Sequence, residues 1–213
     1  MATRVLLTSF GPFELHDKNP SEAVVAAVAA EGMPGAEIVT HAFPVAYEDV
    51  ARDLPLLWQR ALLQLVIHVG VYTRGVISVE SQSFNRGYCR PDIHGCVPPD
   101  NVCLADCAEE VLHSPLNVQQ ILDSVKGDEG YSQLGVEVES SDDPGRYLCA
   151  FSYALSLSRA SEGASLFIHI PMKERRSIAL VGQTQAFLSV RGVADGRSET
   201  MAQKSTGSWT LHM

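Results

Sequence analysis

Three residues of types that serve in catalysis lie at the ends or starts of apolar segments: Glu80, Cys149 and His169. Glu80 ends the apolar run 75–80, and His169 closes a later one. Cys149 falls in the first turn of residues 147–161, whose apolar residues recur at helical spacing. A thiol activated by an imidazole that a carboxylate orients is the general arrangement for acyl transfer. The three residues therefore predict a nucleophile, a base and an orienting acid.

Each of these residues also has a purely structural interpretation. A buried cysteine is often a small hydrophobic residue, and His169 fits equally a core histidine with satisfied hydrogen bonds. Position favours the chemical interpretation, because free N–H groups and the dipole at a helix start stabilise a thiolate. Ligands of open α/β sheets bind at the carboxyl ends of strands. Spacing alone leaves both interpretations open.

Apolar runs of strand length alternate with segments of helical periodicity. Strands are expected at 5–9, 36–43, 65–71, 75–80, 136–140 and 165–170, and helices at 20–31, 47–63, 117–126 and 147–161. Asn19 and Pro20 mark the start of the first helix and Gly32 its end. Pro55 should kink or split the second. This alternation predicts an α/β fold, a three-layer α/β/α sandwich around a single twisted, mostly parallel sheet.

The stretch from Ser81 to about Ser114 loses this periodicity and is rich in Gly, Pro, Asp and Asn. It is expected to be a long loop, and loops of that length inside compact domains are often functional or mobile. Four of the five cysteines fall within it: Cys89, Cys96, Cys103 and Cys107. Their gaps of six, six and three residues lack the close pair that is typical of structural zinc sites, so no metal is predicted.

Composition limits the function classes. With 213 residues and 46% hydrophobic residues, the chain is expected to form one domain, residues 1–172. A net charge of -9 argues against binding to nucleic acid or an anionic membrane. The apolar run 61–71 is too short to span a membrane, and residues 1–10 do not fit a signal peptide. A cytoplasmic protein with free thiols is therefore expected.

The segment 173–213 differs from the rest. Its lysines and arginines are scattered among Gly, Ser and Thr without a sustained amphipathic period. We expect a divergent, poorly ordered tail, with a short strand or helix near 186–190.

Four stretches carry a resemblance to a known family. SFGPFELHDKNPS, LVIHVGV, DPGRYLCAFSYALSL and FIHIP occur in this order over about residues 4–171. Together they resemble pyroglutamyl peptidase I, also called pyrrolidone-carboxylate peptidase, with vertebrate-type and "1-like" sequences most similar. The resemblance implies a cysteine omega-peptidase without a cofactor, in which Cys149 is the nucleophile, His169 the base and Glu80 the orienting acid. Its partners would be peptides with an N-terminal pyroglutamate.

The resemblance also implies substrate-binding residues. Phe10 and Phe13 would pack on the pyrrolidone ring, which is small, flat and uncharged. Asn19 matches the family's asparagine, although it equally suits a helix N-cap. Asn85 fits the family's spacing after Glu80, and Arg90 stands near where many bacterial members carry an arginine beside the oxyanion. Nothing in the sequence distinguishes a monomer from an oligomer.

Several departures from the family pattern keep a second function class open. Pro144 replaces an alanine and removes a backbone N–H, Glu14 replaces a glycine, and Ser81 stands where a basic residue is usual. No long amphipathic helix is recognisable after Met172. A catalytically weakened member that binds pyroglutamyl peptides or acts as an interaction protein is the alternative to an active peptidase. An unrelated α/β hydrolase or transferase is a third possibility.

Overall fold

The computed structural model describes residues 2–13, 17–127, 131 and 137–172. Glu14 and the segment 173–213, with its expected element near 186–190, lie outside the described residues. The strands are β1 (Thr3–Phe10), β2 (Ala36–Phe43), β3 (Leu65–Tyr72), β4 (Ile77–Glu80), β5 (Gln82–Phe84), β6 (Val111–His113), β7 (Val138–Ser141) and β8 (Ala164–Pro171). The helices are α1 (Pro20–Glu31), α2 (Tyr47–Ala61), α3 (Val118–Lys126) and α4 (Leu148–Leu157), with a 3₁₀ turn η1 at Pro99–Asn101.

Six strands form one sheet in the order β2-β1-β3-β8-β4-β7. Strands β2, β1, β3 and β8 are parallel, whereas β4 runs antiparallel to β8 and parallel to β7. The predicted mostly parallel α/β sheet is thereby confirmed. The reversal at β4 follows from its connection to β3, because residues 73–76 are too few for the crossover that parallel strands need.

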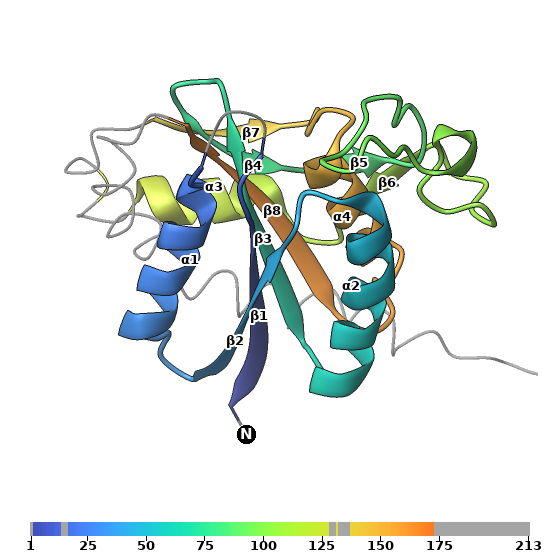
Figure 1. The fold of residues 1–213 in the computed structure, drawn as a ribbon. Helices are drawn as coiled ribbons and strands as arrows, with labels where there is room; N and C mark the ends of the chain where they lie inside the picture. The colour runs from blue at the N-terminus through green and yellow to red at the C-terminus, as the bar shows by residue number, and fades with distance from the viewer. Residues whose placement is uncertain (1, 14–16, 128–130, 132–136, 173–213) are drawn as a thin grey trace, which may run out of the picture.

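Helices cover both faces of this sheet (Figure 1). The side chains of α1 and α3 pack on one face, against the cluster that contains Val5, Ile67 and Ile168. Those of α2 and α4 pack on the other, against Leu6, Val66 and Phe167. Because side chains alternate along a strand, residues 68 and 70 of β3 and 167 and 169 of β8 point to the second face. We call this the α4 face.

The helix boundaries follow the expected local signals. The side chain of Asn19 caps α1 by accepting a hydrogen bond from the Ser21 N–H (3.1 Å), and Gly32 ends the helix at φ 82°. Pro55 does not split α2, which runs unbroken from Tyr47 to Ala61. Burial of Val50 and Leu54 on the α4 face outweighs the one backbone hydrogen bond that proline removes. No helix among the described residues is long and apolar enough to cross a membrane.

The stretch after Glu80 carries more structure than a loop. Strands β5 and β6 form a second, antiparallel sheet within it. The carboxylate of Asp92 accepts hydrogen bonds from the backbone N–H groups of Tyr47, His94 and Cys96 at 2.9–3.0 Å, which fastens the segment to the start of α2. The expectation of an irregular loop was therefore wrong at its two ends, where strands of only three residues are too short to show a period.

Gly163 tests how tightly α2 is packed on the start of β8. A Cβ at this position would lie 2.8 Å from Cζ3 of Trp58 and 3.0 Å from the carbonyl oxygens of Leu63 and Gln64. We expect Gly163→Ala to lower the free energy of unfolding by about 1–3 kcal/mol, as measured by urea denaturation. The matched control is Gly75→Ala, whose Cβ meets no atom within 4 Å and which should stay within about 0.5 kcal/mol of wild type. Equal stabilities of the two variants would contradict this packing.

Candidate active site

A cavity of about 400 Å³ opens at the end of the sheet where α4 begins. Its walls come from the ends of β1, β3 and β8 and the residues that follow them, from the residue Val45 after β2, from the stretch after Glu80 and from the start of α4. The lining residues are Phe10, Phe13, Asn19, Val45, Val71, Tyr72, Thr73, Arg90, Pro144, Gly145, Arg146, Tyr147, Leu148, Cys149, His169 and Met172. The lining is largely apolar, and the thiol and the imidazole are its reactive groups.

Cys149 is the second residue of α4. The chain reaches the helix through Gly145, whose φ of 81° suits glycine, and through Tyr147, an extended N-cap residue without a side-chain cap. The first N–H groups of a helix have no intrahelical acceptor, so those of Leu148 and Cys149 are not used by backbone carbonyls of α4. A negative charge that develops at this helix start is stabilised by these groups and by the helix dipole.

Gly70 of β3 allows Cys149 to approach the sheet. A Cβ added at residue 70 would lie 2.8 Å from Sγ of Cys149 and 2.8 Å from Cζ of Phe167, which is closer than real Cβ contacts permit. The sulfur therefore rests directly on the strand backbone. Sequence reasoning did not single out Gly70 as a site residue. A glycine inside a buried strand was the available signal, because it often marks a close approach by another group.

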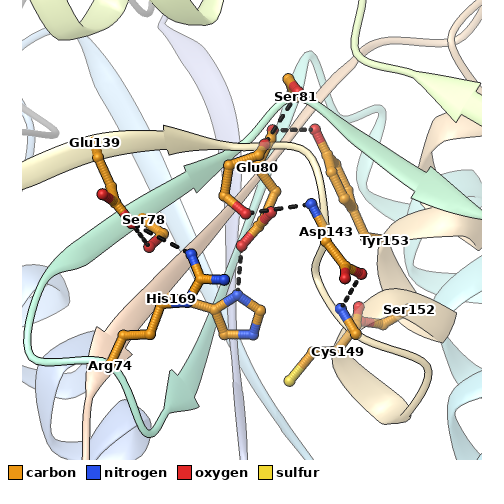
Figure 2. Close-up of polar contacts among 12 residues, drawn as sticks. Arg74, Ser78, Glu80, Ser81, Glu139, Asp143, Cys149, Ser152, Tyr153 and His169 are labelled. Carbon is orange, nitrogen blue, oxygen red and sulfur yellow. Dashed lines mark hydrogen bonds and ion pairs between the residues drawn. The ribbon is translucent and has the colours of Figure 1, made fainter.

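His169 and Glu80 form a buried pair beside the thiol. Nδ1 of His169 lies 2.7 Å from Oε1 of Glu80, and both side chains are only 2% exposed. The remaining ring nitrogen faces Cys149, and Figure 2 shows the sulfur on the side of the imidazole away from the carboxylate. Tyr153 of α4 donates a hydrogen bond to the Glu80 carbonyl oxygen at 3.0 Å. The three predicted catalytic residues thus meet.

The pKa of His169 reflects two opposed effects. Burial lowers it, whereas hydrogen bonds to Cys149 and Glu80, together with their charges, raise it, and the resulting pKa is about 9. Oε2 of Glu80 is buried without a partner in the described part of the chain, so this carboxylate interacts mainly with the imidazole. A pKa of about 9 keeps the His169 ring protonated at neutral pH.

Glu80 reaches His169 by a route that the sequence argument did not foresee. Carboxyl ends of parallel strands share one sheet edge, but β4 is antiparallel to β8, with Ser78 opposite His169 and Glu80 opposite Phe167. Glu80 is therefore the diagonal neighbour of His169, close enough for its long side chain. Glu80 is the last residue of β4, as expected, but the carboxyl end of β4 does not lie at the same sheet edge as that of β8.

Four of the five predicted substrate-binding residues line the cavity: Phe10, Phe13, Asn19 and Arg90. Asn19 also caps α1, and its amide donates to the Gly11 carbonyl oxygen at 3.1 Å, so it holds the turn between Phe10 and Phe13. Arg90 lies over the ring of Tyr147, with its guanidinium carbon 4.2 Å from the ring centroid. Two segments place these four residues at the cavity: the stretch from the end of β1 to the start of α1, and the stretch after Glu80.

Asn85 is not brought to the cavity. Its side chain is fully buried and donates to the carbonyl oxygens of Leu104 and Cys107, both at 3.1 Å, and accepts from the Leu104 N–H at 2.8 Å. The prediction that it binds substrate does not agree with this position. An asparagine that satisfies three backbone groups instead fixes the chain near the second sheet.

Two of the departures from the family pattern, Pro144 and Ser81, lie in different parts of the structure. Pro144 lines the cavity, and the following Gly145 N–H donates to Oδ1 of Asp143 at 3.1 Å, so this turn is held by a side chain. Ser81 donates its hydroxyl to the Ser141 carbonyl oxygen at 3.0 Å and links β4 to β7. Neither departure removes an N–H group of the first turn of α4.

The five cysteines are all free thiols. Cys89 and Cys96 are exposed, whereas burial raises the pKa of Cys103. Among the residues that the structure describes, no group of three or more His, Cys, Asp or Glu side chains is arranged to hold a metal ion.

Comparison with known proteins places these features in a family. A family model described as pyroglutamyl peptidase matches residues 3–196, a range that continues beyond Met172. Pyroglutamyl-peptidase 1 of Homo sapiens is 34% identical over 172 residues, 78% of each chain. Pyroglutamyl-peptidase 1-like protein of Homo sapiens is 33% identical over 140 residues, which cover 65% of this chain and 67% of the relative.

Solved structures agree in fold. A pyrrolidone carboxyl peptidase from Thermococcus litoralis superposes with a TM-score of 0.78 at 19% identity, covering 99% of this chain and all of the other. Pyroglutamyl peptidase I of Bacillus amyloliquefaciens gives a TM-score of 0.75 at 21% identity over 90% of this chain and 97% of its own.

Gly70→Ala tests the close approach of the thiol to β3. The added methyl group must displace the Cys149 sulfur and the Phe167 ring, which lies beside His169, and misplacement of a reacting group by about 1 Å can slow a reaction by roughly 100-fold. We expect alkylation of Cys149 by iodoacetamide to slow by at least about tenfold. Mass spectrometry of the tryptic peptide Tyr147 to Arg159 reports on this cysteine alone. An unchanged rate in folded protein would refute the contact.

A second experiment follows the His169 proton. We expect the imidazole to titrate near pH 9 by NMR and to titrate lower in Cys149→Ala, because that variant loses the hydrogen bond and charge of Cys149. The signal is assigned by its absence in His169→Gln. The folded pKa lies above the ordinary value of 6.5, so this residue contributes its full stabilisation below about pH 6.5 and loses it as pH rises through about 9. If His169 titrated identically in Cys149→Ala, the predicted contact between the Cys149 and His169 side chains would be refuted.

Proposed function

The chain belongs to the pyroglutamyl peptidase family, and we propose that it removes N-terminal pyroglutamate from peptides through Cys149, His169 and Glu80. The observation that carries the proposal is the buried His169–Glu80 contact of 2.7 Å, beside a thiol that opens into an aromatic-lined cavity. Residues 1–172 hold all of these groups and form the proposed catalytic domain.

In the proposed acylation step, the Cys149 sulfur attacks the carbonyl carbon of the pyroglutamyl residue. The carbonyl oxygen becomes an anion, for which the first N–H groups of α4 are suitable donors. When the tetrahedral intermediate collapses, the C–N bond breaks and His169 transfers its proton to the leaving amine. The peptide without its first residue leaves, and the pyroglutamyl group stays on the sulfur as a thioester.

In the proposed deacylation step, the now neutral His169 accepts a proton from water. The hydroxide equivalent attacks the thioester carbon, and the C–S bond breaks to release free pyroglutamate. Glu80 keeps the Nδ1 proton of His169 in place throughout and stabilises the imidazolium when it forms. Proton transfer by such a histidine contributes roughly 10²- to 10⁴-fold in rate.

We assign selection of the lactam ring to the two aromatic residues at the end of β1 and in the turn after it, Phe10 and Phe13. Phe10 is 3% exposed and Phe13 packs against the same core, so both are held before substrate arrives. An apolar slot favours a neutral ring over the charged α-amino group of an ordinary N-terminal residue, because burying that charge without a partner is costly. Arg90, stacked on Tyr147, stands at the wall of the cavity and is a candidate contact for the peptide that leaves.

We further propose that the protein works in the cytoplasm. The reaction requires Cys149 as a free thiol, and the other four cysteines are unpaired as well. A reducing compartment preserves that state.

The test is hydrolysis of a fluorogenic pyroglutamyl amide by reduced protein. We expect turnover that is lost in Cys149→Ala and after alkylation of the thiol. Glu80→Gln keeps the shape of the carboxylate but not its charge, and should lower kcat by about 10²-fold or more with a smaller change in KM. The fall reflects a histidine whose imidazolium form is no longer stabilised.

Controls separate this proposal from its alternative. Prolyl and unblocked glutamyl amides should be poor substrates, since the first lacks the ring carbonyl and the second lacks the ring. Circular dichroism confirms that each variant is folded. A folded wild-type protein that binds a pyroglutamyl peptide without cleaving it would overturn the peptidase and support the catalytically weakened binder.

A further inference from the structure

A buried polar bridge connects the sheet to α4 two helical turns after the nucleophile. His68 of β3 uses both ring nitrogens: Nδ1 lies 2.7 Å from Oγ1 of Thr8, and Nε2 lies 2.8 Å from Oγ of Ser156. Trp58 of α2 donates its indole N–H to the same Ser156 oxygen at 3.1 Å. All four residues are at most 2% exposed, and none lines the cavity.

Trp58 fixes the direction of one hydrogen bond in this bridge, because an indole N–H can only donate and Oγ of Ser156 therefore accepts from it. A hydroxyl has one proton and two lone pairs, so Ser156 can either donate to or accept from Nε2 of His68, and Thr8 takes the matching role at Nδ1. Burial lowers the pKa of His68 to about 3, which keeps the ring neutral, so one ring nitrogen donates and the other accepts.

The bridge and the nucleophile share one face of α4. Residues 149 and 156 are seven apart, about two turns, and therefore lie on the same side of the helix. His68 and Gly70 are two apart on β3 and point to the same face of the sheet. Helix α4 thus meets β3 at two places, with Cys149 on Gly70 and Ser156 bonded to His68. Two such contacts fix the position of the helix along the strand.

We propose that the His68–Ser156 hydrogen bond is a positioning contact, which sets α4 along β3 and thereby holds Cys149 within reach of His169. The inference deepens the proposed function, because it rests on Cys149 as the nucleophile. The same ring supports the base: His68 stacks on Phe167 at 5.8 Å and 20°, and Phe167 lies 4.7 Å from the ring of His169.

The two hydrogen bonds of His68 have different consequences. Thr8 and His68 are already partners in the β1–β3 ladder, so their side-chain bond adds no constraint between separate elements. The Ser156 bond passes from the sheet to the helix that carries the thiol. Removing one or the other therefore distinguishes a loss of stability from a loss of positioning.

The experiment compares Ser156→Ala with Thr8→Val in the full chain. Each variant removes one hydrogen bond from the His68 ring, and each should lower the melting temperature. We expect Ser156→Ala alone to slow alkylation of Cys149 by iodoacetamide by about tenfold or more and to reduce kcat in proportion, with KM within about twofold. Thr8→Val should keep the alkylation rate and its pH profile within about twofold of wild type.

Equal slowing in both variants, or none in either, would overturn the proposal and leave the bridge a purely stabilising feature. If Ser156→Ala does not fold, His68→Gln and His68→Asn replace the pair. The Gln amide reaches the place of Nε2 and keeps the link to Ser156, whereas the shorter Asn amide reaches only that of Nδ1. Rapid alkylation in Gln and slow alkylation in Asn support positioning, and the reverse order or equal rates contradict it.

Alkylation of Cys149 requires no peptide turnover, so the experiment can contradict the proposed peptidase function and the positioning contact independently. A wild-type chain that cleaves no pyroglutamyl amide overturns the proposed peptidase. If its alkylation rate still depends on Ser156, the positioning contact stands.

Discussion

The contact between the Cys149 sulfur and the backbone of β3 at Gly70 is the constraint on which the site depends. It demands a strand residue without a side chain, because a Cβ there would lie 2.8 Å from the sulfur. It also demands that α4 begin at the sheet edge, which the left-handed turn at Gly145 permits. Once the helix start is fixed in this way, the sulfur lies in the first turn of α4, beside the imidazole and at the wall of the cavity.

The reactivity of the Cys149 sulfur then depends on the protonation of His169 beside it. Burial alone would keep His169 neutral, since a charged imidazole is poorly solvated inside the protein. Cys149 on one side and Glu80 on the other outweigh this penalty, and the pKa of His169 rises to about 9. Oε2 of the Glu80 carboxylate has no hydrogen-bond partner in the described structure, so the carboxylate interacts mainly with the imidazole of His169. A base held so close to the thiol stores the proton that the leaving amine later needs.

The sequence was informative where local chemistry determines structure. Asn19 with Pro20 predicted the start of α1, and apolar runs located the central strands within a residue or two. Long-range pairing was less accessible. The reversal of β4 was not predicted, and neither was the position of β8 between β3 and β4, because both depend on pairing across the whole sheet. Asn85 shows the same limit, because a matching spacing could not reveal that its amide is used by backbone groups of residues 104 and 107.

The two faces of the sheet are built by different rules. On the α1 and α3 side, valine, leucine and isoleucine fill the interface, and apolar burial is sufficient to hold the helices. The α4 face instead encloses Thr8, His68, Glu80, Ser156 and His169, each hydrogen-bonded. Buried polar groups stabilise a core less than well-packed apolar side chains do. Their hydrogen bonds are directional, however, and therefore fix one position of the helix on the sheet, whereas apolar packing also accommodates shifted positions. For the alignment of the Cys149 thiol with the His169 imidazole, a fixed position of α4 matters more than additional stability of the core.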